Sequence, residues 1–180
     1  MELMTVVAIV GVLSAMAVPT FTSYVYKSRT TEAIEFLNVI RLREEAYRSE
    51  FGTYCPTVEA SKAPDVIGSL DAIGNFVPNP SKSRYDPMYF NPASTNPEWR
   101  QLGAAPSGPV RFGYAVVAGD PSTIPKNMGF EAKRDFWWVA RGVADLDVDG
   151  IYVQFETYSA SKNIFVGKWP DGTPIDSGYE

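Results

Sequence analysis

An apolar segment near the N-terminus constrains this chain more than any other feature. Residues 3–18, LMTVVAIVGVLSAMAV, hold no charge, and only Thr5 and Ser14 are polar. As a helix the segment spans roughly 24 Å at 1.5 Å per residue, slightly less than a bilayer core. The apolar pattern continues to Val25, which makes up the difference. The sequence therefore predicts a helix that is buried in lipid or in lipid-like surroundings.

A single carboxylate stands at the outer end of this segment. It belongs to Glu2, and the next charged residue is Lys27. A buried carboxylate without a partner costs several kcal/mol, and no basic residue nearby in the sequence reaches Glu2. Glu2 is therefore expected either to pair with another molecule or to extend to the membrane interface. A signal anchor would carry basic residues at this place instead.

After Pro19 the pattern becomes amphipathic. Apolar residues recur at spacings of three, four and seven, as on one face of a helix. They are Ala33, Phe36, Leu37, Ile40, Tyr47 and Phe51. Gly52 and then Pro56 end the pattern. The sequence predicts one helix of about fifty residues, with Gly11 and Pro19 as its two weak points.

Four charged residues of the amphipathic part are spaced as ion pairs. Arg41 precedes Glu45 by four residues, and Glu44 precedes Arg48 by four. Opposite charges at this spacing meet on the surface of a helix. Both pairs are expected on the solvent side.

Composition excludes several kinds of active site. The 180 residues hold no histidine and one cysteine, Cys55. Ser–His–Asp and Cys–His catalysis, histidine-ligated metals, an internal disulfide and a multi-cysteine zinc site are therefore excluded. The net charge of −5 argues against binding nucleic acid by bulk charge. Hydrolysis by carboxylates alone stays open as an alternative, but the chain is expected not to be an enzyme.

The second half of the chain predicts a loop region and then a sheet. Residues 55–109 carry nine of the fourteen prolines, which predicts an ordered surface loop with short turns. After residue 109 the pattern has a period of two, as in strands. Strands are predicted at 110–117, 136–141, 151–158 and 163–169. Of the neighbours Trp137 and Trp138, one should face the helix and the other should face outward or into the loop.

These segments together predict an α+β roll. One long N-terminal helix has an apolar half that protrudes and an amphipathic half that packs on a four-stranded antiparallel sheet. The apolar half of the helix is expected at 1–26 and the amphipathic half at 27–54. The proline-rich region is expected at 55–109, the sheet at 110–169 and a C-terminal tail at 170–180.

An acidic turn lies between the second and third predicted strands. Asp145, Asp147, Asp149, Gly150 and Glu156 satisfy the calcium-loop pattern D-x-D-x-D-G-x5-E. The three aspartates converge where the chain turns, and Glu156 could close the coordination shell. The flanks are strands instead of the helices of an EF-hand, so a hairpin turn with solvated acids is the alternative. Ca2+ is thus an optional ligand, and no cofactor is required.

Residues 1–25 closely resemble the N-terminal helix of type IV pilins and of type II secretion pseudopilins. Glu2, Gly11 and Pro19 lie at that family's relative spacings within an otherwise featureless apolar helix. The sequence FGTYCP at 51–56 is similar to the family's G-x-Y-P helix end. The resemblance implies the pilin-like roll described above and a role for these three residues in subunit assembly.

The resemblance also implies a route of assembly. Glu2 would pair with the N-terminal ammonium of a neighbouring subunit as the subunit leaves the inner membrane, where it is stored as a single-pass protein. A prepilin peptidase, an assembly platform and a motor ATPase are the implied partners, and methylation is the implied modification. Family members carry a basic leader and a cleavage point just before the position of Met1, so this sequence is expected to lack the leader and the first residues.

The leading interpretation is a type IV pilin, polymerised with itself and other pilins into an extracellular filament for adhesion, surface motility or uptake. The alternatives are a pseudopilin of a type II secretion system, a minor pilin, and a membrane-anchored binding module. Length and the proline-rich region favour a pilin. No nucleic-acid partner is indicated. Cys55 is expected to be an inert thiol, with an intersubunit disulfide as the alternative.

Overall fold

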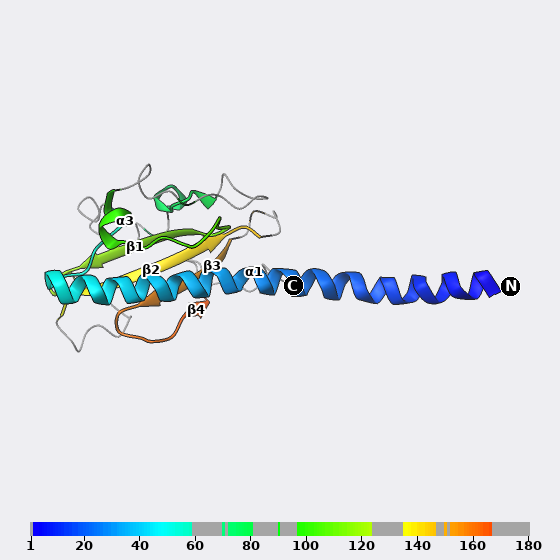
Figure 1. Cartoon of the computed structure of the whole chain (residues 1–180). Helices are drawn as coiled ribbons and strands as arrows, with labels where there is room; N and C mark the ends of the chain where they lie inside the picture. Colours follow the sequence, from blue (N-terminus) through cyan, green and yellow to red (C-terminus); the bar gives the residue numbers. More distant parts are fainter. Residues whose placement is uncertain are drawn as a thin grey trace.

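The computed structural model of the chain describes residues 2–58, 70, 72–80, 90, 97–123, 135–146, 150 and 152–166. A helix of 50 residues, α1 (Glu2–Phe51), begins the chain. A four-stranded antiparallel sheet follows, formed by β1 (Gly113–Gly119), β2 (Trp137–Ala144), β3 (Val153–Tyr158) and β4 (Phe165–Val166). Among the described residues before the sheet are two short helices, η3 (Ile73–Asn75) and α3 (Pro97–Leu102). The predicted α+β class is confirmed (Figure 1).

The helix divides into two unlike parts. Its first part, Leu3–Thr22, extends away from the rest of the molecule and is here called the protruding half (Figure 1). Its second part lies along the sheet, and together with the sheet and the described loop segments it forms the head. The helix ends where the sequence predicts, because Gly52 adopts a φ of 76° and donates its N–H to the carbonyl of Arg48 at 2.8 Å.

The sheet is a meander with the strand order β1-β2-β3-β4. Its four strands confirm the predicted number and direction, but their boundaries differ from the predicted ones, most clearly in β1 and β2. β1 begins at Gly113 instead of residue 110, since the N–H groups of Arg111 and Phe112 donate to the carboxylate of Glu32. β2 continues to Ala144, through a glycine, Gly142, that admits the ring of Tyr114.

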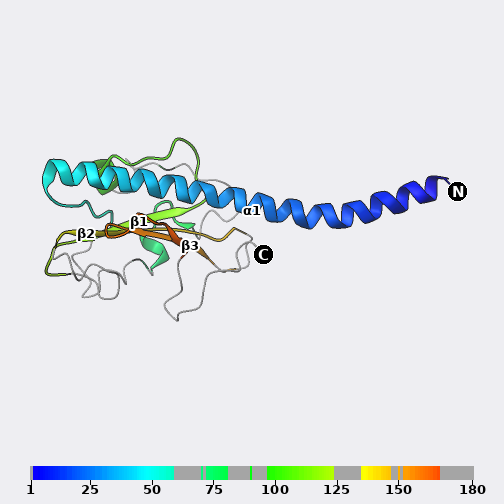
Figure 2. The same cartoon turned by 90° about the horizontal axis from the view of Figure 1, so that it is seen from below.

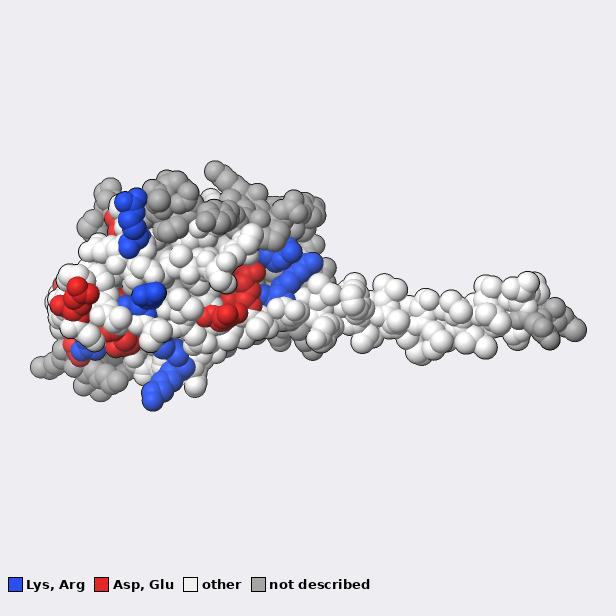
Figure 3. Space-filling model, viewed as in Figure 1, with Lys and Arg blue, Asp and Glu red and all other residues white. Residues whose placement is uncertain are grey.

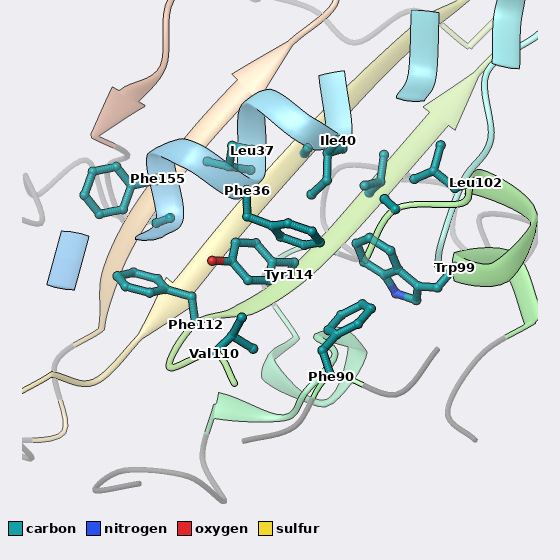
Figure 4. Close-up of a cluster of buried hydrophobic side chains, with 14 of the residues drawn as sticks. Phe36, Leu37, Ile40, Phe90, Trp99, Leu102, Val110, Phe112, Tyr114 and Phe155 are labelled. Atoms are coloured by element: carbon teal, nitrogen blue, oxygen red, sulfur yellow. The ribbon is translucent and has the colours of Figure 1, made fainter. Parts of the chain in front are cut away.

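One face of the sheet packs against α1 and forms the main hydrophobic core. Phe36 on the helix contacts Tyr114 on β1 edge-on, with ring centroids 4.5 Å apart (Figure 4). The ring centroid of Phe36 also lies 5.7 Å from that of Phe90. The centroid of Phe90 in turn lies 5.1 Å from that of Trp99 on α3. The aromatic residues of the proline-rich region that the structure describes are therefore buried, as their composition predicts.

The opposite face of the sheet is covered by the proline-rich region. Its cluster includes Val58, Leu70 and Phe76 from that region and Trp137 from β2. Trp138 points to the other face and joins the helix-side core. Both tryptophans are buried, with 1% and 0% of their surface exposed. The alternative in which one tryptophan faces the loop is thus confirmed, and every residue of β2 is buried.

Of the two charge pairs predicted on the solvent side of α1, that of Glu44 and Arg48 is wrong, whereas in the other pair Glu45 is exposed as predicted. Glu44 is fully buried in the head. Arg41 donates to the hydroxyl of Thr157 and to the carbonyl of Lys162, the latter at 2.5 Å. Arg48 pairs with Asp135 at 2.5 Å. The i,i+4 rule fails because these side chains bind groups on the sheet and its turns, which are distant in sequence.

Candidate assembly surface

The protruding half presents apolar side chains on all sides. None of Leu3–Thr22 is buried, and its mean hydropathy is 2.1. Leu3 and Met4 are 80% and 81% exposed. Figure 3 shows no red or blue atom on the visible face of this half. Such an uninterrupted apolar surface is far larger than a soluble monomer leaves in water, so lipid or other helices must cover it. By length and composition this helix could cross a membrane.

Pro19 lies within the helix without ending it. Proline has no N–H to donate to the preceding turn, so a carbonyl loses its partner here. The hydroxyls of two threonines that follow donate to nearby carbonyls: Thr20 to Met16 at 2.9 Å, and Thr22 to Pro19 at 2.8 Å. The helix curves gently along its length in Figure 2. These two threonine hydroxyls therefore bond within the helix.

Of the predicted assembly residues, Gly11 and Pro19 lie in the protruding half. Glu2 is the first residue of α1, and its side chain is outside the described structure. A Cβ added to Gly11 would meet nothing within 4 Å. Nothing within the described chain therefore requires glycine there, and its small size leaves room for a neighbouring helix. The roles of Glu2, Gly11 and Pro19 in assembly stay predictions.

The head contains a buried carboxylate that sequence reasoning missed. Glu44 accepts the N–H of Cys55 at 2.9 Å through Oε2, while its Oε1 has no hydrogen-bond partner. Burial raises the pKa of Glu44 to about 8, and the nearby charge of Glu45 adds to the rise. The signal was present, since Glu44 follows Ile40 by four residues on the apolar face.

Curated proteins similar to this chain are fimbrial proteins of Dichelobacter nodosus. One, named fimbrial protein, is 32% identical over 87 residues, which is 47% of this chain and 51% of the relative. Another, named type IV major fimbrial protein FimA, is 30% identical over 96 residues, 53% of this chain and 55% of the relative. The matched part of the chain is homologous to type IV fimbrial proteins.

The resemblance to type IV pilins is thereby confirmed. The relatives are named as fimbrial proteins and not as enzymes, in agreement with the expectation that this chain is not an enzyme. The chain spans about half the length of the curated relatives it matches. No family model matches the chain, and no solved structure matches it significantly.

The acidic turn between β2 and β3 is described only in part. Asp145 is buried, and its Oδ2 accepts the N–H of Gly150 at 3.2 Å. Asp147 and Asp149 lie outside the described residues. Glu156 lies in β3 opposite Arg141, and their side chains pair at 2.8 Å. Within the described residues no group of three acids, histidines or cysteines is placed to hold a metal, so calcium binding stays a prediction.

Cys55 follows the last residue of α1 by four positions, and its side chain is buried, with 2% of the residue exposed. Its Sγ is 3.8 Å from the carbonyl oxygen of Glu98. Burial, together with the nearby charges of Glu44 and Glu98, raises the pKa of this thiol to about 12. The thiolate that reacts with disulfides and metals is therefore disfavoured at neutral pH, which supports the inert thiol over an intersubunit disulfide.

Proposed function

We propose that this chain is a subunit of a type IV pilus. The observation that carries the proposal is the protruding half, whose side chains from Leu3 to Thr22 are exposed in the single chain. In a filament the same surface would be buried against copies of itself. Each Å2 of apolar surface removed from water is worth about 25 cal/mol, so this burial would drive polymerisation without a chemical step.

Storage in the inner membrane before assembly follows from the same surface. A helix of this length and hydropathy is covered as well by lipid as by other helices. The carboxylate of Glu2 would then favour the filament over lipid. In the apolar bundle it could be neutralised by the N-terminal ammonium of a neighbouring subunit. A prepilin peptidase and an assembly platform are proposed as partners on the basis of the resemblance.

The head would form the outer surface of the filament. Its sheet is closed on both faces, by α1 and by the proline-rich region, and its tryptophans are buried. The head therefore folds around its own core while the protruding half stays available to neighbours. Adhesion, surface motility and uptake are the filament activities that such a subunit could serve.

The experiment that tests this proposal is to shear cells that make the protein and to measure its intact mass in the released fraction. An abundant species from this chain in that fraction is expected. The membrane fraction of the same cells is the control for total amount. Retention of the whole pool in the envelope, with none in the sheared fraction, would contradict a surface pilus and would favour the pseudopilin alternative.

A further inference from the structure

A groove follows one flank of α1 in the head. It has a volume of about 290 Å3 and lies between the helix and residues 105–110. The helix contributes Glu32, Glu35, Phe36 and Val39 to its lining. The walls are thus apolar, through aromatic, valine and proline side chains, and two carboxylates stand among them. A groove of this kind suits a side chain with an apolar stem and a cationic end.

The two carboxylates differ in what they already bind. Glu32 Oε1 accepts the N–H groups of Arg111 and Phe112, at 2.7 and 3.3 Å. This oxygen is therefore held in place by the start of the sheet. Glu35 is exposed and forms no hydrogen bond or ion pair within the described part of the chain. Its carboxylate is free to receive a cation from outside.

The opposite flank of the helix carries a cation of the required kind. Arg41 follows Glu32 by nine residues, which is about two and a half turns at 3.6 residues per turn, so the two side chains leave opposite sides of α1. Arg41 holds the turn between β3 and β4 by donating to the carbonyls of Ser161, Lys162 and Asn163. Figure 1 shows α3 and β1 on one side of α1 and β4 on the other.

The side chain of Lys162 is exposed on this second flank. Its ammonium makes no hydrogen bond or ion pair with the described residues. The Arg41 contacts fix the backbone of the turn, so the lysine is presented from a rigid support. One flank of the head therefore offers a carboxylate in a groove, and the opposite flank offers a long cationic side chain.

We propose that the groove receives Lys162 of a second copy of this chain, with its ammonium against Glu35. The two surfaces lie on different flanks, so the contact is head-to-tail, and a pair of copies leaves one groove and one lysine unused at its two ends. A contact of this type continues into an open assembly instead of closing a dimer. The inference rests on the proposed function and names the surface through which neighbouring heads meet.

Covalent trapping tests the contact in sheared filaments. The full chain is given Glu35→Cys and Lys162→Cys together, and each substitution alone serves as a control. The buried thiol of Cys55 stays in place. After treatment with a bifunctional thiol cross-linker as long as the replaced lysine and glutamate side chains, the double variant should form a ladder of covalent multimers, while both single variants should stay monomeric. Filaments of the double variant that yield monomers only would overturn the proposal.

Charge exchange provides a second test that does not depend on cross-linking. Glu35→Lys and Lys162→Glu should each lower the yield of sheared filaments, because like charges would face each other. The chain with both substitutions should regain the yield. Arg43→Glu is the matched control, since Arg43 is also an exposed base of the head, and it should leave the yield unchanged. No rescue by the double exchange, or normal filaments from both single variants, would overturn the inference.

These outcomes separate the inference from the proposed function. If the unsubstituted chain is absent from the sheared fraction, the pilus proposal itself fails. If the unsubstituted chain is present and the exchanges behave otherwise than described, the pilus proposal stands and the groove contact is wrong.

Discussion

Glu44 of the long helix accepts a hydrogen bond from the backbone N–H of Cys55, at 2.9 Å, inside the head. The bond joins the last turns of α1 to the first residues of the proline-rich region. It also places an ionisable group in the core, with Oε1 lacking any hydrogen-bond partner. The stability of the head is therefore expected to depend on the protonation of this carboxyl.

Glu44 makes the head less stable as pH rises. Its pKa is raised from 4.5 to about 8 in the folded chain. The folded state thus holds the proton longer than the unfolded state. The stabilising contribution is complete below about pH 4.5, falls by about 1.4 kcal/mol per pH unit above that, and is lost by about pH 8.

Glu44→Gln should remove this part of the pH dependence, because an amide does not titrate. The measurement is urea unfolding of the full chain in detergent at a series of pH values between 5 and 9. Near-ultraviolet circular dichroism monitors the unfolding. Glu50→Gln is the matched control on the exposed side of the same helix, and it should keep the slope of the parent. Equal slopes for parent and Glu44→Gln would count against this role of Glu44.

Glu156 should stabilise the sheet without calcium. Its Oε2 lies 2.8 Å from Arg141 Nη2, and both side chains are largely buried. Arg141 also donates to the carbonyl of Leu70 in the proline-rich region, at 3.3 Å. Glu156→Gln removes the charge of this partner from a largely buried pair, so we expect a loss of about 3 kcal/mol in unfolding free energy, equal in EDTA and in calcium. A loss seen only with calcium would assign Glu156 to the metal instead.

Calcium at the acidic turn has a separate test. If the aspartates of the turn bind Ca2+, millimolar calcium should raise the melting temperature of the protein, since a ligand that binds only the folded state stabilises it. Asp147→Ala should abolish the rise, whereas Glu156→Gln should keep it because Glu156 is engaged by Arg141. The calcium prediction is rejected if the parent protein melts at the same temperature with calcium and with EDTA.

Glu2 should be required for assembly but not for insertion. Glu2→Ala removes the one carboxylate of the apolar end of the chain, so lipid should accept the helix at least as well as before. Filaments should be lost, because a neighbouring ammonium would have no partner. Quantitative blotting of membrane and sheared fractions measures both effects, with Ser14→Ala as the control for loss of a polar group. Normal filaments from Glu2→Ala would refute the pairing.

The sequence predicts the features that depend on local pattern. The period of the apolar residues identifies α1, and Gly52 marks its end because a positive φ is needed there. The alternation after residue 109 identifies the strands and their antiparallel order. Such features follow from the residues in or beside each element, so a single sequence contains them.

Features that depend on distant contacts are missed. The backbone of Arg111, which the sequence predicts to be in β1, donates its N–H to Glu32 on the helix instead. No local pattern predicts this contact, because the two residues are far apart in sequence. The i,i+4 spacing of Glu44 and Arg48 predicts an exposed pair on the solvent side. The core instead accepts the carboxyl, since the backbone of Cys55 supplies a donor. The groove likewise depends on where residues 105–110 meet the helix.

The most direct test of the filament account compares two charged substitutions on α1. Leu13 is 61% exposed on the protruding half, and Leu42 is 70% exposed on the head. In the single chain, Leu13→Glu and Leu42→Glu should therefore be equally harmless to the fold of the head. The measurement is the amount of each variant in the sheared filament fraction. The account predicts that Leu13→Glu abolishes the filaments while Leu42→Glu retains them; normal filaments from Leu13→Glu would contradict it.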